Sequence, residues 1–169
     1  YGNIHFLNGA TFFRNVSWSL LSGKLRGKAD PALSQMKTNG AGSTGVYVYA
    51  FDWGSTHEIF GSITLPLDYK AGSNIYPHIN RMLNDTPDLV TDVFRVGFEF
   101  TWCQKDGTMS NTTINEQEIA IGANADSKLI RSELTALTGT GHTAGSTLLF
   151  RFYREAVVTG TETELALFV

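Results

Sequence analysis

The chain has 169 residues, a length that fits one domain with a sizeable buried core. Hydrophobic residues make up 42% of it, but charged residues only 17%. Gly, Ser, Thr and Asn take their place, a mixture that favours an all-β protein rich in turns. The net charge of −3 and the lack of a basic tract argue against nucleic acid as a partner. No hydrophobic run approaches the roughly 20 residues of a transmembrane helix, so no membrane partner is predicted.

The predicted elements begin with an N-terminal arm over residues 1–15, followed by one β domain over residues 16–169. Residues 12–21 are a weak strand candidate. Residues 28–45 are predicted to form the longest loop, with a possible helical turn after Pro31 and a flexible, glycine-rich second half. Residues 45–51 are β-branched and aromatic, which is typical of a strand.

The clearest strand is predicted over residues 92–102, where hydrophobic and polar side chains alternate. Similar alternation predicts strands over residues 57–66, 146–155 and 163–169, and residues 113–121 are a weaker candidate. Residues 125–137 could form a short helix or a strand, and the surrounding β pattern favours the strand. Turns are predicted at residues 68–74 and 105–111. Eight or nine strands with short turns indicate an antiparallel β-sandwich or a barrel.

Residues 61–82, GSITLPLDYKAGSNIYPHINRM, are interpreted as strand, turn and strand. Pro66 ends the first strand, Gly72 permits the turn, and Pro77 begins the second strand where no ladder hydrogen bond is needed. His78 is interpreted as a packed, hydrogen-bonded residue that fixes the turn, in preference to a ligand.

The residues whose side chains could take part in catalysis or bind a ligand form no recognisable catalytic, cofactor or metal site. The four histidines lack metal-binding spacing, and His57 and Glu58, as neighbours in a strand, should face opposite sides. The single cysteine, Cys103, excludes an intrachain disulfide and has no activating neighbour in the sequence. Glu116 and Glu118 share a face of a candidate strand and are expected to face water. The glycine-rich residues 138–145 lack the context of a phosphate-binding loop. The tryptophans could fill a core or line a glycan site: Trp18, Trp53 and Trp102.

The motif at residues 61–82 resembles a stretch found in small structural proteins of tailed bacteriophages and prophages. The resemblance continues through the strand VFRVGFEFTW and the segment LLFRFYRE, where Arg151 and Arg154 stand at matching places, and it covers residues 16–169. At Asn80 the chain departs from the family, which commonly has Pro-His-x-His here, so a metal-binding role does not carry over to the pair of His78 and Asn80. The matching residues of the motif are Leu65, Pro66, Asp68, Tyr69, Lys70, Gly72, Ser73, Ile75, Pro77 and His78.

This resemblance implies a non-enzymatic virion protein with a β-sandwich of jelly-roll type. Such proteins serve as capsid cement, decoration or head-fibre proteins, usually as homotrimers bound to the lattice of the major capsid protein on the capsid exterior. Two alternatives stay open on the residues alone. One is a receptor- or glycan-binding domain of a tail fibre or baseplate, and the other is a β-sandwich hydrolase whose site assembles from distant strands.

Overall fold

The computed structural model describes residues 15–37, 40–52, 54–83, 93–104, 106–120, 128–156 and 166–168. The protein is all-β, with 49% strand and 2% helix, and all its strand pairs are antiparallel. Within the described residues, no helix is long and hydrophobic enough to span a bilayer. The elements are η1 (Leu20–Ser22), β1 (Ala32–Lys37), β2 (Val46–Phe51), β3 (His57–Thr64), β4 (His78–Leu83), β5 (Val93–Cys103), β6 (Thr113–Ala120), β7 (Ile130–Glu133), β8 (Thr147–Arg154) and β9 (Ala166–Phe168).

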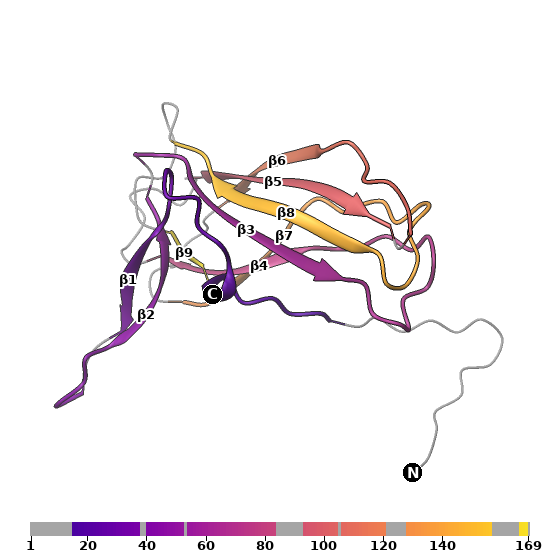
Figure 1. Cartoon of the computed structure of the whole chain (residues 1–169). Helices are drawn as coiled ribbons and strands as arrows, with labels where there is room; N and C mark the ends of the chain where they lie inside the picture. Colours follow the sequence, from indigo (N-terminus) through magenta and orange to yellow (C-terminus); the bar gives the residue numbers. More distant parts are fainter. Residues whose placement is uncertain are drawn as a thin grey trace, which may run out of the picture.

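The strands form a five-stranded sheet in the order β1-β2-β9-β4-β7 and a four-stranded sheet in the order β3-β8-β5-β6 (Figure 1). Four pairings are nested within one another along the chain: β2 with β9, β3 with β8, β4 with β7 and β5 with β6. Further pairings of β4 with β9 and of β5 with β8 complete the sheets. The strands are therefore paired as in one long antiparallel hairpin, whose turn lies between β5 and β6. The two arms of this hairpin fold over together to give the two sheets.

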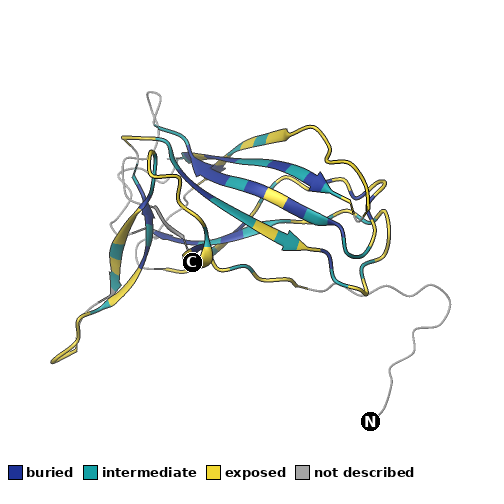
Figure 2. Cartoon of the chain, viewed as in Figure 1, coloured by how far each residue is buried: buried dark blue, intermediate teal, exposed yellow. Residues whose placement is uncertain are grey.

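The two sheets pack against each other through a shared hydrophobic core (Figure 2). Its main cluster combines Phe51 and Ile79 of the five-stranded sheet with Ile59, Phe94 and Phe152 of the four-stranded sheet. A second cluster lies toward the other end of the four-stranded sheet and contains Leu65, Phe100, Trp102, Leu137, Leu148 and Phe150.

Most of the predicted strands are confirmed. The alternating residues 92–102 correspond to β5, in which Phe94, Val96, Phe100 and Trp102 are buried. Residues 113–121 contain β6, and residues 125–137 contain β7, so the strand interpretation was correct where that segment is described. The Asp-Gly turn after β5 is also confirmed, with Asp106 at a φ of 59°.

Two local predictions were wrong. Residues 28–45 contain strand β1 in place of a helical turn after Pro31, because pairing with β2 overrides the local preference of a short mixed sequence. The candidate strand over residues 12–21 is irregular chain followed by η1 in its described part, from residue 15 onward. The predicted N-terminal arm lies outside the described residues, apart from Asn15.

The motif at residues 61–82 does not form a hairpin, because β3 and β4 belong to different sheets. Residues 65–77 cross between the sheets and are tied by backbone hydrogen bonds to the glycine-rich residues 137–146. Gly145 N donates to Leu65 O (3.0 Å), Gly72 N to His142 O (3.1 Å), and Ile75 N to Leu137 O (3.0 Å). These two segments, remote in sequence, thus form one end of the molecule, which we call the loop end.

Candidate functional site

The outer face of the four-stranded sheet carries the densest set of interacting polar side chains in the described structure. Along β8, Leu149, Arg151 and Tyr153 point away from the core, because Leu148, Phe150 and Phe152 are buried in it. The strand registers place residues of β3, β5 and β6 beside them in two rows. One row is Glu58, Tyr153, Gly97 and Glu116, and the next is Phe60, Arg151, Glu99 and Ile114.

Arg151 is the centre of a charged network on this face. Its Nε donates to Glu58 Oε2 at 2.5 Å, and its Nη1 donates to Glu99 Oε2 at 3.1 Å. The second oxygen of Glu58 lies 2.6 Å from Arg26 Nη2, and only 1% of the Glu58 side chain is exposed. Burial alone would lower the pKa of Arg151, but hydrogen bonds to Glu99 and Glu58 outweigh it and raise this pKa. The Arg151 guanidinium also lies 4.1 Å from the centre of the Tyr153 ring.

A second polar cluster adjoins this network through Tyr153. The Tyr153 hydroxyl donates to Glu116 Oε1 (2.8 Å), and Arg95 lies 2.9 Å from Glu116 and 3.1 Å from Glu155. The bond from Tyr153, with help from Glu155 and Arg95, lowers the pKa of Glu116. Burial and a hydrogen bond to Glu116 raise the pKa of Glu155. Of these two neighbouring acids, Glu116 therefore loses its proton first as the pH rises.

Gly97 makes this arrangement sterically possible. A Cβ atom at position 97 would lie 1.9 Å from Tyr153 Cζ and 2.3 Å from its hydroxyl oxygen. Without a side chain at Gly97, the Tyr153 ring can cross β5 and reach Glu116 on β6. This explains why Tyr153 is buried although it points away from the core.

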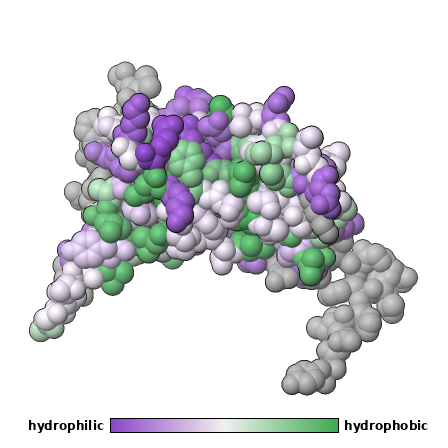
Figure 3. All heavy atoms as spheres, viewed as in Figure 1, coloured by the Kyte–Doolittle hydropathy of each residue, from purple (hydrophilic) through white to green (hydrophobic). Residues whose placement is uncertain are grey.

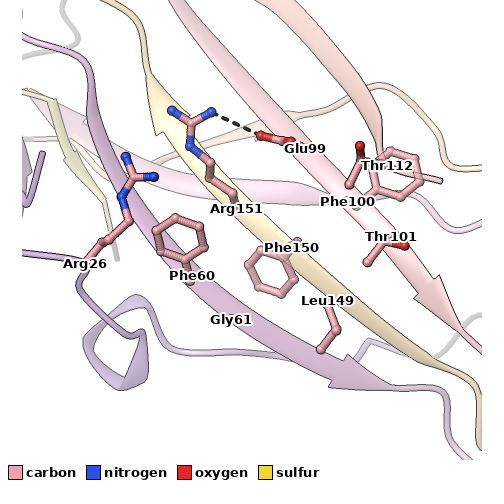
Figure 4. Close-up of a pocket in the computed structure, with 10 residues that line it drawn as sticks. All are labelled: Arg26, Phe60, Gly61, Glu99, Phe100, Thr101, Thr112, Leu149, Phe150 and Arg151. Carbon is pink, nitrogen blue, oxygen red and sulfur yellow. Dashed lines mark hydrogen bonds and ion pairs between the residues drawn. The ribbon is translucent and has the colours of Figure 1, made fainter. Parts of the chain in front are cut away.

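Beside the charged network lies an open depression of about 530 Å³ (Figure 4). Arg26 and Arg151 lie on one side of it, and Thr101 and Thr112 lie on the other. On the face of the molecule shown in Figure 3, hydrophilic side chains gather along the top of the molecule, and hydrophobic side chains lie nearer the middle of the molecule. The depression is thus bordered by charge on one side, and its complete lining is Arg26, Phe60, Gly61, Glu99, Phe100, Thr101, Thr112, Leu149, Phe150 and Arg151.

The structure does not bring the sequence-predicted candidates together into one site. His57 accepts a hydrogen bond from Asp52 N (2.9 Å), on the side of the sheet opposite to Glu58, as the strand alternation predicted. His78 is half-buried at the start of β4, and its imidazole makes no hydrogen bond to any other described residue, so its predicted bonding role is not found. Cys103 is half-buried at the end of β5. Across the described ranges, no three His, Cys, Asp or Glu side chains lie where they could hold a metal ion.

Other candidates take up structural positions. Trp102 is buried in the second core cluster, and Trp18 packs against both clusters, so neither offers an open platform for a sugar. His5 and Trp53 lie outside the described residues. Glu116 and Glu118 are both exposed, as predicted, but Glu116 also binds Tyr153 and Arg95.

His142 occupies a buried position at the loop end. Its ring stacks on Trp102 with centroids 4.2 Å apart, and 9% of His142 and 4% of Trp102 are exposed. His142 Nδ1 and Trp102 Nε1 are buried, and neither has a hydrogen-bond partner in the described structure. Burial lowers the pKa of His142, because the charged imidazolium loses its hydration.

This burial predicts a pH dependence of stability. The unfolded chain binds a proton at His142 more readily than the folded chain does, so stability should fall as the pH drops below about 6.5. The slope attributable to His142 is at most about 1.4 kcal/mol per pH unit, the value for one proton. Urea unfolding between pH 5 and 8 measures it, with His142→Gln as the comparison. Equal slopes for the two proteins would contradict the prediction.

No protein-family model matches the chain, and no curated protein sequence is similar enough to count as a relative. The phage-protein resemblance of the motif at residues 61–82 therefore stays a prediction.

The outer-face network was missed in the sequence because its members come from four separate strands and from the segment between η1 and β1. One signal was present: Gly97 interrupts an otherwise aromatic and β-branched strand, which often marks a close approach of another group. The identity of that group, Tyr153, depends on the register of β5 with β8. A strand register between segments so far apart in the chain does not follow from local sequence.

Proposed function

We propose that this chain is a non-enzymatic structural protein of a tailed-phage virion, a capsid cement or decoration protein that stabilises the head. In this proposal the two sheets form a jelly-roll sandwich, and the chain assembles as a homotrimer on the lattice of the major capsid protein. Its place is on the capsid exterior, without nucleic acid or membrane as a partner.

The nested pairing of strands is the observation that carries the proposal. A jelly roll has eight strands in two sheets and arises when a long antiparallel hairpin rolls up. The pairings of β2 with β9, β3 with β8, β4 with β7 and β5 with β6 have this order, with β1 added at one edge. Because fold alone does not define function, the phage assignment rests on this order together with the motif at residues 61–82.

The outer-face network supports a structural role. Arg151 is committed to Glu58 and Glu99, and Glu116 to Tyr153 and Arg95. These contacts cross from β3 through β8 and β5 to β6, so they hold all four strands in register. Side chains paired in this way stabilise the sheet of a shell protein more readily than they take part in catalysis.

A specific observation also favours the second candidate, a receptor- or glycan-binding domain. The depression beside Arg151 combines the aromatic Phe60 with threonine hydroxyls and charged groups. Such combinations can hold a sugar by stacking and hydrogen bonds.

Heads assembled with and without the protein distinguish the two candidates. For a cement protein, we expect heads that lack it to rupture at lower temperature and under milder osmotic shock. The purified protein should bind assembled heads and give no signal on a glycan array. Equal robustness of the two kinds of head, together with a specific array signal, would replace the cement function by the receptor-binding alternative.

A further inference from the structure

The β1–β2 hairpin projects from the body of the molecule (Figure 1). Among the described strands, β1 pairs only with β2 and forms one edge of the five-stranded sheet. The hairpin ends in a turn that contains Gly42 and Gly45, both at positive φ. Two-stranded hairpins are marginally stable in water unless they pack against something else.

Both faces of the hairpin continue hydrophobic stripes that begin in the body. On one face, Phe51 is fully buried, Tyr49 is half-buried against the main core, and Tyr47 is 47% exposed. On the other, Ala50 and Val48 are buried, whereas Val46 is 62% exposed. Figure 2 shows this change from buried to exposed along β2. The rows of hydrophobic side chains on β2 thus continue beyond the part of the strand that the body of the molecule covers.

The edge strand has only part of the usual protection against pairing with another chain. The usual devices are charged side chains, proline and bulges. Strand β1 has one lysine, Lys37, and one register shift, between Gln35 and Lys37, but no proline. Its exposed Leu33 adds to the uncovered hydrophobic surface.

Charge indicates what covers the hairpin. Residues 32–51 contain Lys37 and no acidic residue, whereas the whole chain has a net charge of −3. The outer face of the four-stranded sheet carries more glutamates than arginines, with Glu58, Glu99, Glu116 and Glu118 against Arg26, Arg95 and Arg151. It also leaves two hydrophobic side chains exposed: Leu149, which lines the depression, and Ile114, which pairs with Glu99 across β5 and β6. This face complements the hairpin both in charge and in hydrophobicity.

We propose that the β1–β2 hairpin of one copy packs on the outer face of the four-stranded sheet of a neighbouring copy. The inference rests on the homo-oligomer of the proposed function and names its contact surfaces. Because the two surfaces differ, the contact is heterologous, and a closed ring such as a trimer satisfies every copy.

Oligomeric state tests the hairpin directly. Light scattering after size exclusion should show an oligomer for the unaltered chain and a monomer for the double variant V46S/Y47S. The variant Y76S, which alters a tyrosine that is 57% exposed in the connection between β3 and β4, should remain an oligomer. Thermal melts should show all three proteins folded, since the altered side chains are exposed. An oligomer that persists in V46S/Y47S, or an unaltered chain that is monomeric, overturns the proposal.

Cross-linking identifies the receiving surface. In a Cys103→Ser background, one population carries Val46→Cys and the other Ile114→Cys. We expect disulfide-linked dimers mainly in the mixture. Cross-linking confined to Val46→Cys alone would show hairpin-to-hairpin pairing and overturn the heterologous contact. The head-rupture experiment is a separate readout, so a failed hairpin contact can be told apart from a failed cement function.

Discussion

Replacing Arg151 by methionine is expected to destabilise the protein by about 3 kcal/mol, because it leaves the buried Glu58 carboxylate short of a partner. Loss of one member of a buried ion pair commonly costs about 3–5 kcal/mol. The lower end applies here because Arg26 still lies 2.6 Å from Glu58. Methionine retains most of the side-chain length, so the change isolates the charge and its hydrogen bonds.

A matched control is available in the surface pair of Arg131 and Glu133. These side chains are 2.7 Å apart but 51% and 61% exposed. Arg131→Met should therefore cost only about 0–1 kcal/mol. Urea unfolding followed by tryptophan fluorescence measures both variants. Equal losses in the two would show that the burial of Glu58 adds nothing to the network.

Replacing Gly97 by alanine is expected to cost about 1–3 kcal/mol, the usual range for overpacking. The added methyl group would overlap the Tyr153 ring, which must move and release Glu116. Gly40→Ala is the control, because its Cβ would meet only Ser43 Cβ, at an ordinary 3.7 Å. The control should stay within about 0.5 kcal/mol of the unaltered protein.

The effects of substitutions at Gly97 and Tyr153 on the free energy of unfolding should also be coupled. In a Tyr153→Ala background the space is open, so Gly97→Ala should cost much less than it does alone. Equal costs in both backgrounds, in the same unfolding assay, would show that the ring is not what excludes a side chain at position 97.

The strands of the four-stranded sheet were largely predictable, because their alternation is a local property. Phe94 to Trp102 alternate with polar residues, and burial follows that alternation. Strand β1 was not predictable from its own residues, since Pro31 and the mixed sequence after it fit a helical turn equally well. Its pairing partner, β2, decides the outcome.

The candidate site was less predictable than the strands. Nothing in the sequence of each strand marks out the outward-facing residues Arg151, Glu58 and Glu99. Only the strand registers bring these side chains within bonding distance. The loop end shows the same limit. A turn was predicted at residues 68–74, but its hydrogen bonds to residues 137–146 depend on contacts between residues about 70 positions apart along the chain, such as Gly72 and His142.

The position of β9 between β2 and β4 has a consequence for biosynthesis. A strand near residue 50 cannot acquire its inner neighbour until residues 166–168 have left the ribosome. Until then, the growing chain holds two unsatisfied strand edges that could pair with other nascent chains. Folds dominated by such long-range pairings form in milliseconds to seconds, and here that time can begin only once β9 is available to pair. Slow synthesis of the preceding strands therefore offers this protein little protection, and dilution or a chaperone during synthesis should raise the yield of folded molecules.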